Sequence, residues 1–538
     1  MPAEAPSSFE LLQGLLQVPP PRPSRLQRLL PSSGTLPQLN DPARPGYRLL
    51  LPWITGLRSL AQVIFINNPL SGALLLLAFL LESPWMALLA VVGTAGANLT
   101  SRAFRLAPGL RHEGIHGFNG ALVGCAGAVL GRSASPASAG LWLLLVLLGS
   151  GATTVLLEGW SRLFRGRGAL PPLTLPFCLI TWGLLALAGL LPLGPADPAP
   201  LLSSELLASP LQALLQGLPR SFGQVFLCSG LGSGALVLLG TALASPLAAA
   251  LGLLGALAAM LGALALGVST AAVAQGLWGY NGVLVAIAIG GIFHAPTRRS
   301  LLLAIAGAAF TAPLSMAVMP LLPGLPALTI VFVLSTWLLK LVAGRSLPAL
   351  MPVSLHAVVT PEEHRERYRV AREVLGNFRA NLRQRSSGLV SARLSAPIGP
   401  SVPEPLRQQV RLLFAELDRD GDGSLSLPEL HQALNSAAPQ LSALLAAMDL
   451  DGDGRVDLAE FTELIRRLQV LQQGEERLLL YLMPADADGD DRLDAEELRR
   501  LLRSIDQPPL SPGEEQRVFG AAGQPLSWRG FVDRLLLT

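Results

Sequence analysis

Charge is scarce in this sequence. Asp, Glu, Lys and Arg make up 14% of its 538 residues, whereas hydrophobic residues make up 51% and the mean hydropathy is +0.48. Such a composition excludes an ordinary soluble enzyme and indicates a polytopic membrane protein, in a chain long enough for two to four domains. The charge that is present is unevenly placed, because residues 404–538 hold 25 acidic and 14 basic residues while residues 1–403 hold 12 and 26.

Cysteine and recognisable catalytic motifs are scarce as well. The three cysteines, Cys125, Cys178 and Cys228, lie at unrelated spacings in apolar stretches, which excludes a disulfide framework or a CxxC metal site and predicts buried free thiols. The sequence has no GxxxxGK[ST] loop, which argues against an ATP-driven pump. No nucleophile–base pair stands out, so we do not expect an enzyme.

Long uncharged runs lie between positions 47 and 350. No charged residue occurs in the 77 positions between Arg220 and Arg298, nor in the 40 between Arg299 and Lys340. Leu, Ala and Gly dominate these runs without the alternation of a β-barrel, so helices of about 20 residues must span the membrane. We expect an all-α membrane domain over 47–350, preceded by a leader over 1–46 in which no cleaved signal peptide is visible.

This membrane segment repeats itself. QVIFINNPLSGALLLLAFLLESP (62–84) aligns without gaps with QVFLCSGLGSGALVLLGTALASP (224–246), 162 positions later, with 11 identities in 23 positions. The same offset places GIHGFNGALV (114–123) over GLWGYNGVLV (276–285), and PPLTLPF (171–177) resembles PALTIVF 155 positions later. The domain is therefore a duplication, with repeats over about 47–200 and 209–350.

Two interpretations of the repeated glycine-rich phrase compete. The phrase GxxGxNG could simply pack helices closely. Duplicated membrane domains, however, commonly bind a solute between their repeats, on interrupted helices. The repeated Gln, Thr and aromatic residues favour the second interpretation, and because they are neutral they suit a small uncharged polar solute rather than an ion.

At these residues the sequence resembles the urea transporter family. The resemblance rests on AQVIFINNPLSG, GIHGFNGALVG, LPPLTLPF, GQVFLC, GLWGYNGVLVAIAIGGIF and GLPALT, and it covers about 50–345. It implies ten transmembrane helices plus re-entrant half-helices, in two inverted repeats of five, and a homotrimer with one pore in each subunit.

The resemblance also implies which residues line the pore. Gln62, Val63 and Phe65 would lie on one side, with Gln224 and Val225 on the pseudo-symmetric side. The apolar slot and the narrow middle would be formed by Phe118, Leu122, Tyr280 and Leu284, with Thr174 and Thr329 flanking the middle. Such walls match the flat faces of urea, while amide, hydroxyl and backbone oxygens accept hydrogen bonds from its four N–H groups.

The second repeat departs from the family pattern. SGLGSG (229–234) replaces NNPLSG, Val331 replaces a proline, and Leu227 stands opposite Phe65. The first phrase also has His116 in place of a bulky residue. These changes predict a looser second half-pore and leave open whether urea, a short amide, ammonia or water passes.

The acidic tail carries three segments with calcium-loop spacing. DRDGDGSLSLPE (418–429) fits at every position, because oxygen ligands recur along it and a glycine makes its turn. The expected ligands of the three loops are Asp418, Asp420, Asp422, Ser424 and Glu429; Asp449, Asp451, Asp453, Arg455 and Glu460; and Asp486, Asp488, Asp490, Arg492 and Glu497. In the third loop Asp491 stands where glycine belongs, so we expect strain there.

The tail resembles the EF-hand family over 405–538. Leu425, Val456 and Leu493 stand at the apolar eighth positions, which suits β-pairing between loops. The third hand has no obvious partner, and residues 510–538 are a candidate for a fourth hand that has lost its acids. The stretch 351–404 before the hands holds a basic helix, opened by a capping box at Thr360 and Glu363, and then a flexible linker.

We therefore expect a channel-like facilitator for passive urea permeation, with calcium as its cofactor. We expect it in the cell membrane as a multi-pass protein and a homotrimer, with cytoplasmic EF-hands as candidate regulators of flux, and with no nucleic acid as a partner. One alternative is a membrane-anchored calcium sensor whose transport domain has degenerated. The basic helix has three interpretations: a solvated connector, a contact with anionic headgroups, or a contact with the acidic tail.

Overall fold

A computed structural model describes most of the chain. The described residues are 32–41, 43, 46–131, 136–164, 170–190, 209–346, 350, 359–386, 404–434, 444–445, 448–449, 454–486, 488, 490–520 and 522–537. They fall into two compact units, one within Pro23–Arg365 and the other within Glu366–Thr538. Both units are built from helices, and the only described strands are two-residue pairs in the second unit. The predicted all-α fold is therefore confirmed.

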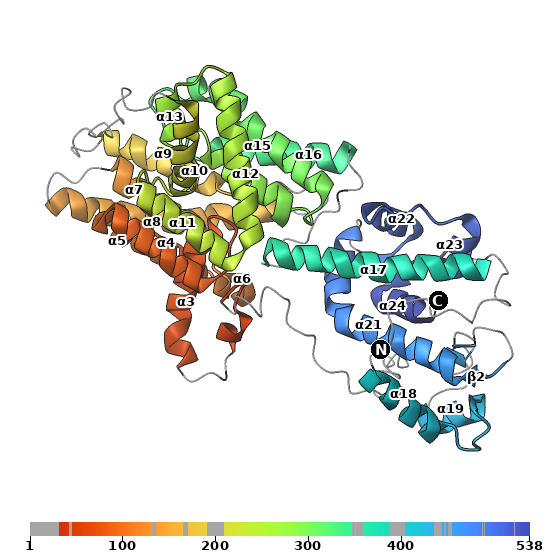
Figure 1. The fold of residues 1–538 in the computed structure, drawn as a ribbon. Helices are drawn as coiled ribbons and strands as arrows, with labels where there is room; N and C mark the ends of the chain where they lie inside the picture. Colours follow the sequence, from red (N-terminus) through yellow and green to blue (C-terminus); the bar gives the residue numbers. More distant parts are fainter. Residues whose placement is uncertain are drawn as a thin grey trace. The chain divides into compact units, whose positions relative to one another are not determined.

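The helices of the first unit occur in two matching series (Figure 1). The first series is α3 (Tyr47–Gln62), α4 (Pro69–Glu82), α5 (Pro84–Ala103), α6 (Pro108–His112), α7 (Phe118–Leu130), α8 (Pro136–Leu163) and α9 (Leu175–Leu190). The second is α10 (Pro210–Gln224), α11 (Leu231–Ala244), α12 (Pro246–Ala265), α13 (Thr270–Ala274), α14 (Tyr280–Ile287), α15 (Arg298–Val318) and α16 (Ile330–Ser346). Helices α4 to α8 begin 162 positions before their counterparts, so the duplication read from the sequence is present in the fold.

Three described helices are long and apolar enough to cross a membrane: α8, α12 and α15 with its short extension η4 (Met319–Leu321). Several shorter helices, such as α4, α9 and α16, are also apolar. Large side chains including Leu81, Leu148 and Leu302 point outward and are more than half exposed. An apolar outer surface of this kind suits lipid rather than water. Inside, all three cysteines are buried free thiols, as predicted.

Glycine allows α7 and α14, the helices that carry the repeated glycine-rich phrase, to approach their neighbours. A Cβ on Gly120 in α7 would lie 2.4 Å from the carbonyl oxygen of Gly93 in α5. In the second repeat, a Cβ on Gly282 in α14 would lie 2.5 Å from the carbonyl oxygen of Gly255 in α12. Because no side chain fits at these crossings, the phrase does pack helices closely, whatever else it does.

The described residues of the second unit show three helix–loop–helix hands, and the strand and second helix of a further hand, the second in order. The first two are formed by α18 (Glu404–Leu417), α19 (Leu427–Leu434) and α21 (Leu458–Leu482), with strands β1 (Ser424–Leu425) and β2 (Val456–Asp457). The last two follow η6 (Met483–Ala485) and are formed by β3 (Arg492–Leu493), α22 (Ala495–Ser504), α23 (Pro512–Phe519), β4 (Leu526–Ser527) and α24 (Trp528–Leu537). Both strand pairs are antiparallel.

Strand pairing identifies the partner of the third hand. Leu425 pairs with Val456, and Leu493 pairs with Leu526 across β3 and β4. The expected loop pairing at the eighth positions is thus confirmed. Residues 512–537 form the predicted fourth hand, which kept its helices and its strand although its loop has lost the acidic ligands.

One helix has contacts that belong to both units. Helix α17 (Pro361–Ser386) begins where the sequence predicted, and the Glu363 N–H donates to Thr360 Oγ1 at 3.4 Å. Its first turn lies in the first unit and the remainder in the second. In the second unit its apolar face is buried, with the Phe378 ring edge-to-face with Phe531 at a centroid distance of 6.0 Å. Of the three interpretations of this helix, contact with the acidic tail is therefore correct.

We expect Gly120→Ala to destabilise the membrane unit by about 1–3 kcal/mol, because the added methyl group overpacks the crossing with α5. The measurement is the thermal unfolding midpoint of the purified protein in detergent. Gly189→Ala is the matched control, since nothing lies within 4 Å of the added Cβ and the residue is exposed in α9. An equal midpoint for the two variants would contradict the close approach of α7 to α5 at Gly120.

Candidate functional site

A sharp bend precedes the last helix of each repeat. Leu173 and Leu328 have φ angles of 50° and 47°, in the left-handed region that L residues rarely adopt. Each bend lies two residues before its helix, α9 or α16. In an apolar surrounding, the backbone groups freed by such a bend need protein partners.

The asparagines of the repeated phrase supply those partners. Asn119 Nδ2 donates to Leu173 O at 3.2 Å, and its Oδ1 accepts from the Phe177 N–H at 3.1 Å. In the second repeat, Asn281 Oδ1 accepts from the Phe332 N–H at 3.1 Å. In the first repeat one side chain thus bridges the bend, whereas in the second Asn281 binds the Phe332 N–H; the sequence did not reveal either role.

The hydroxyl of Tyr280 completes the second clamp. It donates to the carbonyl of Leu328, the residue at the second bend. The sequence placed Tyr280 in the apolar slot, where its hydroxyl was the difference from Phe118. Because Leu328 O takes that hydroxyl, Tyr280 and Phe118 can both present an apolar ring.

The two predicted threonines meet directly across the repeats. The Thr329 hydroxyl donates to Thr174 Oγ1 at 2.7 Å, and Cys178 Sγ lies 3.5 Å from Thr329 Oγ1. Both threonines are 2% exposed and each follows one of the bends. The fold therefore brings together two residues 155 positions apart at one point of repeat contact.

The two predicted glutamines adopt matching poses. Gln62 Nε2 donates to Glu113 O at 3.0 Å, and Gln224 Nε2 donates to Gln275 O at 3.1 Å. Each amide is thereby fixed by its nitrogen. Among the described residues, no hydrogen bond is recorded to either Oε1, which leaves one acceptor on each side for a solute N–H.

The predicted apolar wall residues divide into two groups by exposure. Phe65, Phe118 and Tyr280 are half-buried, as is Leu227 opposite Phe65. The Phe65 ring packs edge-to-face with Phe332 at 6.0 Å and with Phe293 at 6.2 Å. The remaining predicted wall residues are fully enclosed in the same core: Val63, Leu122, Val225 and Leu284.

The turn SGLGSG is supported from the first repeat. Its counterpart uses Asn68, whose side chain caps α4, whereas Gly230 before α11 has no side chain. The Glu82 carboxylate takes this place: it accepts from the N–H groups of Ser229 and Gly230 at 2.8 and 3.1 Å and from the Ser233 hydroxyl at 2.5 Å. A carboxylate at a helix N-terminus is favourable, so Glu82 supports the turn that SGLGSG forms.

The other described acidic side chains of the two repeats are also bound to protein. Glu113 lies 3.3 Å from the fully buried Arg58, which donates to Asn40 Oδ1 at 2.6 Å. Glu158 pairs with Arg162 at 2.9 Å. These carboxylates serve structure, which leaves the proposed wall neutral; Asp197 and Glu205 lie outside the described residues.

The first calcium loop brings three of its carboxylates close together. Oxygens of Asp418, Asp420 and Asp422 lie within 4.8 Å of one another. Glu429 Oε2 accepts from the Ser426 hydroxyl at 2.7 Å, and this bond holds the pKa of Glu429 below its usual value. Oxygen donors of this kind, in a loop of this length, fit Ca²⁺. Ser424 is the expected carbonyl ligand.

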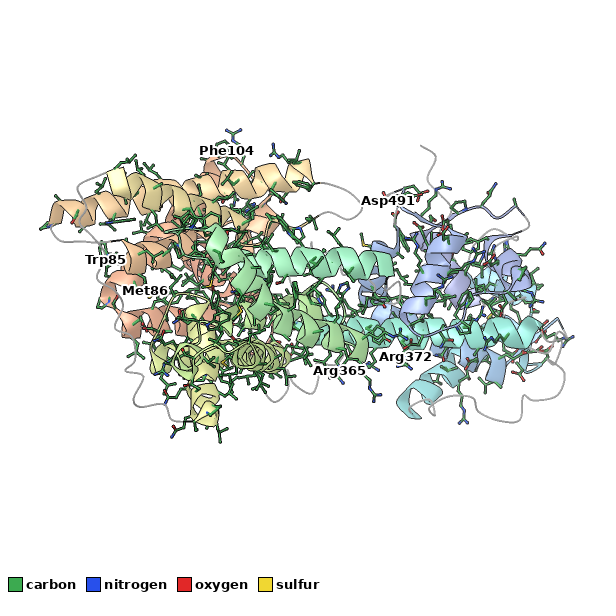
Figure 2. The ribbon with its side chains drawn as sticks, turned by 90° about the horizontal axis from the view of Figure 1, so that it is seen from above. Trp85, Met86, Phe104, Arg365, Arg372 and Asp491 are labelled. Atoms are coloured by element: carbon green, nitrogen blue, oxygen red, sulfur yellow. The ribbon has the colours of Figure 1, made fainter. Side chains whose placement is uncertain are left out.

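The third loop has the same arrangement with one difference. Asp486, Asp488 and Glu497 come within 4.8 Å, with Asp490 and Arg492 in the same loop. Asp491, labelled in Figure 2, has φ 59°, whereas Gly423 at the matching position of the first loop has φ 81°. Left-handed backbone is costly for a residue with a Cβ, which is the strain that the sequence predicted.

The second loop is described only in part. Its first carboxylate, Asp449, its seventh residue, Arg455, and its closing carboxylate, Glu460, are described. The Arg455 guanidinium lies 2.8 Å from Asp422 of the first loop. Asp451 and Asp453 lie outside the described residues.

Helix α17 is held by the fourth hand through a buried ion pair. Arg379 Nη1 lies 2.8 Å from Glu514 Oε2, and both side chains are almost fully buried. Burial by itself would raise the pKa of Glu514, but the Ser511 N–H and Arg379 outweigh it and hold that pKa below the ordinary value. An amphipathic helix bound against such hands is a familiar mode of peptide recognition.

Comparison with known proteins agrees with this architecture. The urea transporter family matches residues 54–344, and an EF-hand domain pair matches residues 407–466. Urea transporter 1 of Ovis aries is 32% identical over 332 residues, which is 60% of this chain and 84% of that protein. Urea transporter 1 of Rattus norvegicus is 33% identical over 334 residues, with the same shares. These relatives are transporters, in agreement with the prediction that the chain is not an enzyme.

We expect Arg379→Met to destabilise the docking of α17 by about 3–5 kcal/mol, because Glu514 is then buried without its cation. The double variant Arg379→Met/Glu514→Met should recover most of the loss. Hydrogen exchange of the amides of 366–386 in the full chain measures both effects.

The same pair predicts an acid-sensitive contact. Because the pKa of Glu514 is lowered in the folded state, the stabilisation is present above the ordinary carboxyl pKa and is lost as pH falls through the lowered value. Protection of 366–386 should therefore decline at low pH in the wild type and much less in the double variant. Equal pH profiles would contradict the assignment.

Proposed function

The chain belongs to the urea transporter family, and we propose that it is a channel-like facilitator through which urea crosses the membrane passively. The observation that supports this most strongly is the contact of Thr174 with Thr329 between the repeats. Each repeat also holds a glutamine that is fixed by its side-chain nitrogen, which leaves its Oε1 as an acceptor. A flat solute with several N–H donors can exchange its water for such acceptors in stages. A hydrated ion would lose much more solvation energy against the same neutral walls.

Several finer features belong to this proposal. The membrane domain is taken as residues 47–350 and the EF-hand domain as residues 405–538. We infer an inverted arrangement of the repeats, a homotrimer with one pore in each subunit, and a position in the cell membrane with the hands in the cytoplasm. Urea is the inferred permeant, and the departures Leu227 and Val331 make selectivity among small neutral solutes the property to measure.

Stopped-flow urea uptake into proteoliposomes tests the proposal. We expect Gln62→Leu to lower urea permeability about tenfold, since a solute hydrogen bond is worth about 1–1.5 kcal/mol net. Gln212→Leu is the matched control, because Gln212 is an exposed residue of the same type in α10. Wild-type liposomes no more permeable than protein-free ones would refute urea conduction.

Calcium regulation is the second part of the proposed function. We infer that Ca²⁺ binds the first and third loops through the carboxylates already brought together there, and that the second loop binds as well. The observation that favours regulation is the docking of α17 on the fourth hand, whose strand β4 pairs with β3 of the third hand. Because α17 is one continuous helix whose first turn belongs to the membrane unit, a calcium-dependent change in these hands would act on its position.

We expect Asp491→Gly to tighten calcium binding at the third loop about fivefold, since relief of a left-handed backbone is worth about 1 kcal/mol. Calorimetric titration of the full chain in detergent measures the change. Asp506→Gly offers a control, because Asp506 also has a positive φ, of 61°, but lies outside the calcium loops. An unchanged affinity in Asp491→Gly would show that the loop carries no strain relevant to binding.

A further inference from the structure

Helix α14, which carries the glycine-rich phrase of the second repeat, ends differently from its counterpart α7. Helix α7 continues to Leu130, whereas α14 passes into one π-helical turn, η3 (Ala288–Ile292). The Phe293 N–H that closes this turn donates to Ala288 O at 2.7 Å. Single π-turns within helices are frequent at functional sites. Here the turn places Phe293 against Phe65, a residue of the proposed pore wall.

Phe293 is fixed by more than one neighbour. Its ring is 2% exposed and meets the Phe65 ring edge-to-face at a centroid distance of 6.2 Å. Lys340 Nζ of α16 lies 4.5 Å from the centre of the Phe293 ring. A cation over a ring face is attractive, most of all away from water. Because Phe293 directly follows the π-turn, its position also depends on how that turn is held.

The first turn of α17 holds that π-turn. His364 Nδ1 lies 2.8 Å from Gly291 O, and because a carbonyl only accepts, this ring nitrogen donates. A Cβ on Gly291 would lie 2.7 Å from Pro361 Cγ, so the proline ring occupies the space that any other residue would fill. His364 is 2% exposed. The contact between α17 and the π-turn is thus buried, and it depends on the fit of Pro361 and His364 against Gly291.

A second contact from the same turn fixes the neighbouring helix. Glu362 accepts from the Ser245 hydroxyl at 2.6 Å and from the Leu247 N–H at 2.8 Å, at the N-terminus of α12. Helix α12 is the one that α14 crosses at its glycines. At the equivalent start of α5, the only side-chain cap among the described residues is that of Ser83. The first turn of α17 is thus an addition to the second repeat alone.

We propose that Glu362 and His364 are positioning residues that hold Phe293, and through it Phe65, and so set the width of one end of the pore. This inference rests on the proposed function, because it assigns Phe65 to the wall of a conducting pore. A ring held from several sides excludes a solute larger than the one it fits. Releasing the π-turn lets Phe293 and Phe65 move apart, and a solute with one more methyl group then passes.

The test is the ratio of methylurea to urea permeability, measured by stopped flow in proteoliposomes with the full chain. We expect His364→Ala and Glu362→Gln each to raise this ratio about tenfold, since one methyl group in a tight apolar site commonly carries that much discrimination. His364→Asn, whose Nδ2 can take the place of Nδ1 as the donor, should restore the wild-type ratio. Arg365→Gln is the matched control, because Arg365 lies in the same turn and is exposed (Figure 2).

A second variant protects the test against misfolding. If His364→Ala does not reconstitute, Gly291→Ala displaces the Pro361 ring by another route and should raise the ratio equally. Unchanged ratios in these variants, in liposomes whose urea permeability clearly exceeds that of protein-free ones, would overturn the positioning role and leave the proposed function intact. A wild-type chain without urea permeability would overturn the proposed function itself.

Discussion

An apolar surrounding gives a bent backbone no water to bond with, so every bend in the membrane unit must be satisfied by the protein. The bends at Leu173 and Leu328 depend on this constraint. Asn119 meets it at the first bend, and Asn281 and Tyr280 meet it together at the second. With the bends fixed, the residues just before α9 and α16, Thr174 and Thr329, meet across the repeats. The glycines of the phrase matter for the same reason, since they let the helices that carry the asparagines come close enough to act.

Much of this architecture could be predicted from the sequence. The uncharged runs gave the membrane class, the constant offset gave the duplication, and the loop spacing gave the hands, because each is a local or periodic pattern. What the sequence could not give depends on contacts between distant segments. Glu82 supports Gly230 from 148 positions away, and nothing around Gly230 announces it. The fourth hand has lost the acids that mark a hand, so the sequence offered it only as a candidate, and its strand pairing with Leu493 identifies it.

The two repeats differ most where other parts of the chain contact the second one. Glu82 replaces a missing cap in α11, and the first turn of α17 holds both η3 and α12. The remainder of α17 is bound by the fourth hand through Arg379 and Phe378. In the sequence, the second repeat differs by losing residues that the family pattern contains. In the fold, it also gains contacts from Glu82 and from the first turn of α17. Selectivity and regulation would share these contacts if flux responds to calcium.

A double-mutant cycle on Thr174 and Thr329 tests most directly whether the two repeats form one pore. Urea permeability would be measured by stopped flow for Thr174→Val, Thr329→Val and the pair, at matched protein density. Each single change should lower permeability about tenfold, and the pair should lower it by little more, because the two hydroxyls form one hydrogen-bonded unit. Wild-type permeability in either single variant, or losses that multiply in the pair, would contradict a shared pore at this contact.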